Sequence, residues 1–248
     1  MKPHLSRYWL NTPEKDPVLF AEQSGAICRS YAQAVDKYAH GDHTVSTDEM
    51  TGIQALERKS PTKPCRPGQI EKREFEYIRH GTQTLIANLE IASGQVIAPS
   101  INATRTEADF AAHIAQTIIT DPDANWTFIT DQLNTHQSET LVCLVAQLCQ
   151  IDLDLGIKGK AGILESMSSR SIFLGDPTHR IRFIYTPKHS SWLNQIEIWF
   201  STLVRRVLKR SSFLSTNDLR QRLLDFIAFF NKTAKPYKWT YKGRPLQA

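Results

Sequence analysis

The sequence predicts an α/β protein built on a mixed five-stranded sheet with helices on both faces. Five short segments have the character of strands, and helical segments separate the later ones as crossovers. The composition, 41% hydrophobic and 22% charged, is that of an ordinary globular protein. A chain of 248 residues can bury one large core without disulfides or metals as staples. These observations exclude a fibrous or disordered protein.

The first half of the chain supplies three strands in a row. Two of them form a hairpin, because Ser93 and Gly94 interrupt an apolar stretch with a turn signal. The predicted segments are a loose helix at 17–38, a weakly alternating strand at 43–49, a proline-marked basic loop at 57–68, and hairpin strands at 82–92 and 94–98.

The second half alternates helices with strands. Phe110, Ile114 and Ile118 mark the apolar side of an amphipathic helix, which either Thr104 or Thr106 caps. The predicted segments are helices at 106–120, 138–150, 191–209 and 215–231, strands at 126–130 and 181–185, and a glycine-containing irregular stretch at 151–180.

Charge is distributed unevenly along the chain. Residues 181–248 hold 13 basic and 3 acidic side chains, a net charge of +10, whereas residues 1–180 hold 17 and 22, a net charge of −5. A basic end is typical of a protein that binds DNA, although a solvated helical surface gives the same pattern. No apolar run reaches the roughly 18 residues of a membrane span, and the first residues lack a signal peptide. We therefore expect a cytoplasmic, nucleoid-associated protein without membrane contact.

Three acidic residues stand where functional groups are common. Asp48 is expected at the end of the first strand, and Asp131 directly follows the buried strand at 126–130. Ligands of open α/β sheets bind at the carboxyl ends of strands. Glu197 borders the apolar stripe of the helix at 191–209, where a carboxylate is unfavourable unless something pairs with it. Position alone leaves two interpretations open: a shared metal site, or ordinary caps and solvated acids.

A divalent cation would pair with such carboxylates. Mg²⁺ binds carboxylate oxygens and keeps waters and substrate phosphates in its other positions. Two ions about 3.5–4 Å apart can clamp the attacking and leaving oxygens of a phosphodiester displacement. That arrangement requires acids from separate elements, and two strand ends with one helix can provide it.

The sequences around these acids form three distinctive blocks. They are VSTDEMTGIQALER at 45–58, FITDQLNTH at 128–136 and YTPKHSSWLNQIEIWF at 185–200, with the shorter runs RPGQ at 66–69, YIRHG at 77–81 and KPYKWT at 235–240. In this order they resemble the catalytic blocks of bacterial mariner-superfamily transposases, the insertion-sequence six-thirty group. The resemblance spans about residues 1–245. Gln132 stands where that group commonly has Asn.

The resemblance implies a ribonuclease-H-like fold, which the order of strands and helices also allows, and a DDE transposase catalytic domain. It implies two Mg²⁺ or Mn²⁺ ions, with Asp48 and Asp131 holding both and Glu197 completing the second site. The implied reaction is cleavage of DNA at transposon ends followed by strand transfer into target DNA. Positioning and charge neutralisation suffice for such chemistry, without a covalent protein intermediate.

We expect three regions: a linker and helix at 1–38, the catalytic domain at 39–212, and a C-terminal helix and basic tail at 213–248. The resembling group carries helix-turn-helix modules before the first region, so such a module would be separately encoded or absent from a truncated copy. The 65 residues between Asp131 and Glu197 exceed the gap in most of the group. The excess maps to an insertion at about 151–180, which costs little free energy and would shape DNA access.

Further residues have expected supporting roles. Glu49, Asn134 and His136 are predicted to assist the three carboxylates. His136 would contact a phosphate or assist proton transfer, or would simply be hydrogen-bonded beside a polar cleft. The predicted DNA contacts are Lys188, His189, Asn194, Arg205, Arg206, Lys209 and Arg210. A second DNA track, with a solvated surface as its alternative, is formed by Lys63, Arg66, Lys72 and Arg73.

Two other functions stay open at this stage. An inactive DNA-binding remnant would keep the basic surface without cleavage, and a non-transposing nuclease of the same fold would act on RNA–DNA hybrids. The partners expected for the first interpretation are transposon-end DNA, target DNA and a second copy of the chain in a homodimer.

Overall fold

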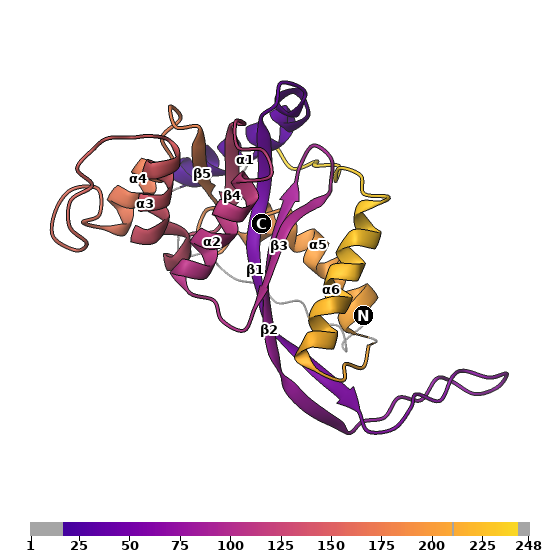
Figure 1. The fold of residues 1–248 in the computed structure, drawn as a ribbon. Coiled ribbons are helices and arrows are strands. Elements are labelled where there is room, and N and C mark those ends of the chain that lie inside the picture. The colour runs from indigo at the N-terminus through magenta and orange to yellow at the C-terminus, as the bar shows by residue number, and fades with distance from the viewer. Residues whose placement is uncertain (1–16, 210, 243–248) are drawn as a thin grey trace.

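The computed structural model describes residues 17–209 and 211–242 (Figure 1). Arg210, the lead-in at 1–16 and the tail at 243–248 lie outside the described residues. The strands are β1 (His43–Arg58), β2 (Tyr77–Glu90), β3 (Val96–Asn102), β4 (Trp126–Thr130) and β5 (Ile181–Tyr185). The α-helices are α1 (Pro17–Ala39), α2 (Glu107–Ile118), α3 (Glu139–Leu148), α4 (Met167–Leu174), α5 (Ile196–Leu203) and α6 (Thr216–Asn231).

The five strands form one sheet in the order β3-β2-β1-β4-β5. The β1–β2 and β2–β3 pairs are antiparallel, whereas β4 runs parallel to both β1 and β5. The predicted mixed five-stranded sheet is therefore confirmed. All five residues of β4 are buried, because this short strand lies between two neighbours and under helices on both faces.

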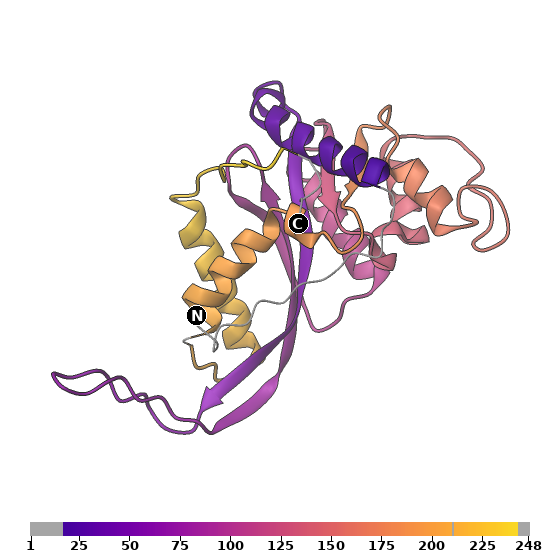
Figure 2. The same cartoon turned by 180° about the vertical axis from the view of Figure 1, so that it is seen from behind.

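Helices cover both faces of the sheet, as predicted (Figures 1 and 2). One core packs α1, α5 and α6 on the face that carries Ala87, Leu89 and Ile129. The other packs α2, α3 and α4 on the face that carries Val45 and Phe128. The alternation of side chains along each strand separates these two cores.

The first strand is much longer than the sequence predicts. We expected it to end near Glu49, but β1 continues to Arg58 as a two-stranded arm with β2 (Figure 1). A register shift between Met50 and Ile53 interrupts the alternation, which is why the pattern stops early. Beyond Arg58 the predicted basic loop is itself a narrow hairpin, with bridges Lys63↔Lys72 and Arg66↔Gln69.

The tip of this arm is a tight turn. The amide of Gln69 donates to the carbonyl of Arg66 at 2.8 Å across Pro67 and Gly68. Gly68 has a φ of +78°, as the third residue of a type II turn requires, and glycine adopts this value without strain. The RPGQ run therefore determines where the chain reverses.

Most helix limits follow their sequence signals. Thr106, Ser138 and Ser215 each accept a hydrogen bond at the start of α2, α3 and α6, so Thr106 rather than Thr104 is the cap of α2. The stretch at 151–180 is not wholly irregular as predicted, because Ser166 caps α4 within it. No helix in the described part of the chain is both long and apolar enough to cross a membrane.

Candidate active site

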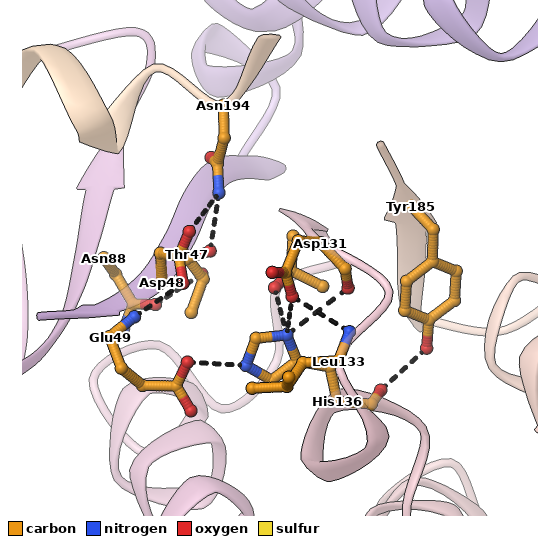
Figure 3. Close-up of polar contacts among 10 residues, drawn as sticks. Thr47, Asp48, Glu49, Asn88, Asp131, Leu133, His136, Tyr185 and Asn194 are labelled. Atoms are coloured by element: carbon orange, nitrogen blue, oxygen red, sulfur yellow. Dashed lines mark hydrogen bonds and ion pairs between the residues drawn. The ribbon is translucent and has the colours of Figure 1, made fainter. Parts of the chain in front are cut away.

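Asp48 lies within β1 and not at its end, which corrects the sequence-based prediction. The last residue pair between β1 and β4 is Ser46↔Ile129, so Asp48 stands just beyond the point where β4 stops pairing. It is 8% exposed. The amide of Glu49 donates to its Oδ1 at 2.8 Å, and Asn194 Nδ2 approaches its Oδ2 at 3.3 Å (Figure 3). The side chain is therefore oriented by fixed neighbours.

Asp131 follows β4 directly, as predicted. Its Oδ1 accepts the amide of Leu133 at 3.0 Å and lies 2.7 Å from Nδ1 of His136 (Figure 3). The side chain is 37% exposed, so a face of the carboxylate remains open to solvent. This is the carboxyl edge of the parallel strands, where ligands of α/β sheets bind.

Glu197 occupies the first turn of α5 and is half-buried. The predicted helix at 191–209 is divided into a short 3-10 turn at Ser191–Leu193, α5, and a π-helical turn at Val204–Leu208. Ile196, Trp199 and Leu203 form its buried side. Glu197 is therefore carried by a helix that is firmly packed against the sheet.

Electrostatics connect the three predicted carboxylates. Burial raises the pKa of Asp48, and the charge of Asp131 raises it further, to about 7. Burial also raises the pKa of Glu197, and Asp131 is again the charge that adds to it. Contacts also connect their three elements: Asn194 bonds both Asp48 and the amide of Glu197, and His136 joins Asp131 to Glu49, the neighbour of Asp48.

His136 lies on the other side of this neighbourhood, between two carboxylates. It is fully buried, with Nε2 2.9 Å from Oε2 of Glu49 and Nδ1 2.7 Å from Oδ1 of Asp131 (Figure 3). Burial by itself would lower the pKa of His136, but the hydrogen bonds and charges of Asp131 and Glu49 outweigh it and raise the pKa. The hydrogen bond and charge of His136 in turn outweigh burial at Asp131 and lower its pKa. The structure thus shows His136 buried and hydrogen-bonded, and a role in proton transfer stays a prediction.

The residues at this edge fit a divalent cation. Within residues 17–209 and 211–242, the compact group of metal-ligating side chains is Asp48, Glu49 and His136, whose ligand atoms lie within 4.8 Å of one another. Oε1 of Glu49 is buried and has no hydrogen-bond partner among the described residues. A hard cation would pair with such an unpaired buried oxygen, and it would stabilise the charged form of the neighbouring carboxyl whose pKa is raised. Both nitrogens of His136 already face carboxylates, which leaves the acids as the open ligands.

Asn194 has a different role from the predicted one. We expected it to contact DNA, but it is fully buried. Its Nδ2 donates to the carbonyl of Thr47 at 3.0 Å as well as approaching Asp48. It therefore supports the site from inside the protein. The sequence offered one signal for this role, its position three residues before Glu197 in the third block.

Lys188 and His189 are exposed beside the site. Together with Asp131 they line a groove formed by residues 131–133 and 186–191. Gln132, the departure from the resembling group, donates to the carbonyl of Thr186 at 2.9 Å and so ties the two sides of this groove. Asn134 is exposed at the start of the 3-10 turn that ends with Gln137.

The basic residues after α5 lie on the surface. Arg205 and Arg206 are exposed on the π-helical turn, and Lys209 follows it. The carbonyl of Lys209 accepts a hydrogen bond from Arg73 of the arm at 3.2 Å. The two basic tracks predicted from the sequence therefore meet at this hydrogen bond. Arg210, the fourth member of this cluster, is outside the described residues.

A family model identifies the family of this chain, and solved structures show its fold. The sequence model described as "DDE superfamily endonuclease" matches residues 43–220. No curated protein sequence matches the chain. The fold is similar to that of the Mos1 transposase paired-end complex with left transposon end, at 12% identity and a TM-score of 0.53, covering 92% of this chain and 60% of that chain.

Two further solved structures share the fold. The Mos1 strand transfer complex is 12% identical with a TM-score of 0.53, covering 92% of this chain and 59% of that one. The Mos1 transposase catalytic domain with raltegravir and Mg is 10% identical with a TM-score of 0.50, covering 89% and 85%. The chain thus spans about 60% of the length of the Mos1 chains in the DNA complexes. The fold is ribonuclease-H-like, as the resemblance implied.

Proposed function

The chain belongs to the DDE superfamily of endonucleases, and on that premise we propose that it cleaves DNA at transposon ends and joins the freed ends to target DNA. One observation carries the proposal: hydrogen bonds join the elements of the three acids, since Asn194 contacts both Asp48 and the amide of Glu197, and His136 joins Asp131 to Glu49, the neighbour of Asp48. The similar solved structures are Mos1 transposase complexes, one with a transposon end and one a strand transfer complex, which supports the choice of substrate.

DDE nucleases use divalent metals, and we propose that Asp48, Asp131 and Glu197 hold two Mg²⁺ or Mn²⁺ ions. When bound, such ions supply charge neutralisation for the attacking and leaving oxygens of a phosphodiester. The protein's own contribution is orientation. Asn194 holds Asp48, and His136 holds Asp131 while it also pairs with the buried Glu49. Groups that orient metal ligands in this way keep the acids in place before the ions arrive.

Lys188 and His189 are well placed to bind a phosphate beside Asp131, because both are exposed in the groove that contains it. Arg205, Arg206 and Lys209 would extend the interaction along the backbone of the duplex. Arg210 is part of the same proposal through its sequence position alone. Phosphate contacts of this kind position DNA without reading its sequence.

Cleavage is tested on a plasmid that carries the coding segment with its flanking DNA, incubated with Mn²⁺ or Mg²⁺. We expect metal-dependent nicking at the element's boundaries, which Asp131→Asn abolishes. Asp152→Asn, which removes an exposed acid in the insertion, is the matched control and should leave nicking intact. Wild-type nicking by Asp131→Asn would exclude the site. Activity on RNA–DNA hybrids alone would identify a non-transposing nuclease, and binding without cleavage an inactive remnant.

DNA binding is tested by its salt dependence. Arg205→Ala combined with Arg206→Ala should weaken binding to all duplexes alike and flatten the salt slope by roughly one unit for each phosphate that the variant no longer neutralises. Lys160→Ala, in the insertion, is the control. Discrimination of end-containing over scrambled duplex beyond about 10³-fold would show that this chain reads sequence itself. Homodimer formation and a separately encoded helix-turn-helix partner remain predictions, which sedimentation with and without end DNA would address.

A further inference from the structure

The helix that carries Glu197 begins in an unusual way. The first backbone amides of any α-helix have no partner within the helix, so a nearby side chain normally accepts from them. Gln195 is the N-cap of α5, and no side-chain cap is formed there by its own segment. In α2, α4 and α6, by contrast, a local Ser or Thr provides the cap.

Two distant hydroxyl groups satisfy these amides. The hydroxyl of Tyr31, on α1, accepts from the amide of Gln195 at 3.2 Å and donates to the carbonyl of Leu193 at 2.8 Å. The hydroxyl of Ser46, on β1, accepts from the amide of Ile196 at 2.9 Å. Both side chains are buried, Tyr31 at 6% exposure and Ser46 at 0%. The start of α5 is therefore held from outside the helix, by residues about 150 and 160 positions earlier in the chain.

Ser46 also connects this helix start to the first carboxylate. Its hydroxyl donates to Oδ1 of Asn194, whose Nδ2 approaches Oδ2 of Asp48. Ser46 and Asp48 are two residues apart on one strand, so their side chains share the face that α5 covers. The hydrogen bonds that begin the Glu197 helix thus continue to Asp48.

We propose that the hydroxyl groups of Tyr31 and Ser46 form a tertiary cap, which positions Glu197 relative to Asp48 for metal binding. The metal-binding part of this inference rests on the proposed function. Tyr31 and Ser46 are positioning residues, since neither reaches the carboxylates. Removing either hydroxyl would release the first turn of α5 while the buried side of the helix still holds it to the sheet.

The surroundings of Tyr31 favour this role. Its ring packs edge-on against Trp239 at 5.0 Å between centroids, and Trp239 Nε1 donates to the sulfur of Cys28 at 3.3 Å. The segment that carries Trp239 passes directly over Gly94, where a Cβ would lie 2.2 Å from the carbonyl oxygen of Lys235. Burial raises the pKa of Tyr31, so its hydroxyl stays protonated and can donate to Leu193. The ring of Tyr31 is thus held by Trp239, and its hydroxyl by the hydrogen bonds with Gln195 and Leu193.

The test compares Tyr31→Phe with Tyr38→Phe. Both remove one hydroxyl from α1, but Tyr38 is 45% exposed and packs on His43 at the far end of the helix. Hydrogen exchange resolved to single amides is measured on metal-free protein. Tyr31→Phe should speed exchange at Gln195 roughly threefold to tenfold, the effect of removing one hydrogen bond. Tyr38→Phe should not change it.

Metal binding provides the second measurement. The Mn²⁺ concentration that gives half of the thermal stabilisation should rise roughly tenfold in Tyr31→Phe, as for groups that orient metal ligands. Ser46→Ala should act in the same direction. Its control is Ser30→Ala, a buried serine whose hydroxyl donates only within α1. A lower melting temperature with unchanged exchange at Gln195 and Ile196 and an unchanged Mn²⁺ midpoint would overturn the inference, because packing alone would then explain the destabilisation.

Neither measurement requires DNA cleavage. If the wild type fails to nick DNA but Tyr31→Phe changes exchange at the start of α5 and the Mn²⁺ midpoint, the cap stands and the proposed function fails. If the wild type nicks DNA and Tyr31→Phe matches Tyr38→Phe in both measurements, the proposed function stands and the cap fails.

Discussion

Asp48 and Glu49 are adjacent in the sequence, yet they belong to two different environments. Asp48 faces α5, is close to Asp131 and has a pKa raised to about 7. Glu49 points to the opposite face of the sheet, where His136 pairs with it at 2.9 Å (Figure 3). Strand alternation thus places one carboxylate of this acidic dipeptide beside the neutral side chain of Asn194 and the other beside His136. Asp131 interacts with both sides, by hydrogen-bonding to His136 and by its charge on Asp48.

The largest expected effect is on DNA nicking, which should depend much more on Asp48 than on its neighbour Glu49. Asp48→Asn should lower metal-dependent nicking more than 100-fold, above the roughly 10–100-fold typical of groups that only orient a ligand. Glu49→Gln keeps a hydrogen-bonding side chain for His136 and should lower nicking by no more than that range. Rates of plasmid nicking at saturating Mn²⁺ measure both.

The two variants should rank in the opposite order when their stability is compared: Glu49→Gln should lose more stability than Asp48→Asn. In metal-free protein at pH 8, Asp48→Asn removes a carboxylate that the folded state holds with a raised pKa, so the variant should be at least as stable as the wild type. Glu49→Gln should be less stable. Equal changes in urea unfolding for the two variants would show that the environments do not differ as described.

The second effect concerns the paired side. His136→Leu leaves Glu49 buried without its partner, and breaking a buried ion pair by removing one member costs roughly 3–5 kcal/mol of unfolding free energy. Urea denaturation of metal-free protein measures this cost. His40→Leu makes the same substitution at an exposed histidine and is the control. It should change the free energy of unfolding by less than about 0.5 kcal/mol. A small change for His136→Leu would mean that the pair carries little free energy.

Much of this site follows from local sequence signals, and the rest does not. The apolar run of β4 sets both limits of that strand and so the place of Asp131. The caps Ser138 and Ser215 fix where α3 and α6 begin. The length of β1 was not predictable, because its outer part is paired only with β2 and its alternation is broken by a register shift.

Contacts between distant residues were also beyond local signals. The bond between Glu49 and His136 joins residues 87 positions apart, and that between Tyr31 and Leu193 joins residues 162 apart. Asn194 was predicted to contact DNA, but packing turns its side chain inward toward Asp48. Sequence periodicity gives the face of a residue on its own element and leaves its partners to the tertiary fold.

The third prediction compares two asparagines of these blocks. Asn194→Ala removes a buried support of Asp48 and should raise the Mn²⁺ concentration for half-maximal thermal stabilisation roughly tenfold. Asn134, predicted from the sequence as an auxiliary residue, is exposed, and Asn134→Ala should leave that midpoint unchanged. A shift in the Asn134 variant alone would assign the supporting role to the exposed residue.

The smallest expected effect concerns His43, which also lies between two carboxylates but outside the candidate active site. It tests whether such a histidine contributes to stability there. His43 lies where β1 begins, 2.8 Å from Glu90 and 3.3 Å from Asp121. Burial would lower the pKa of His43, but the hydrogen bond and charge of Glu90, with those of Asp121, outweigh it and raise the pKa. His43→Gln should therefore lower stability slightly and leave nicking unchanged, since His43 is remote from the three acids.

The stabilisation that His43 provides should depend on pH, and the direction of its pKa shift sets whether it falls or rises with pH. A raised histidine pKa stabilises the folded state fully below the unfolded pKa of about 6.5, and the stabilisation disappears as pH rises through the folded pKa. The difference in unfolding free energy between wild type and His43→Gln should thus be greatest near pH 5.5 and shrink toward pH 9. His113 provides the contrast, because burial lowers its pKa to about 3 and its stabilising contribution is complete only above about pH 6.5. Urea unfolding at four pH values measures how the contributions of His43 and His113 to the unfolding free energy change with pH. A His43→Gln difference that grows with pH would mean that burial, and not Glu90, governs the pKa of this histidine.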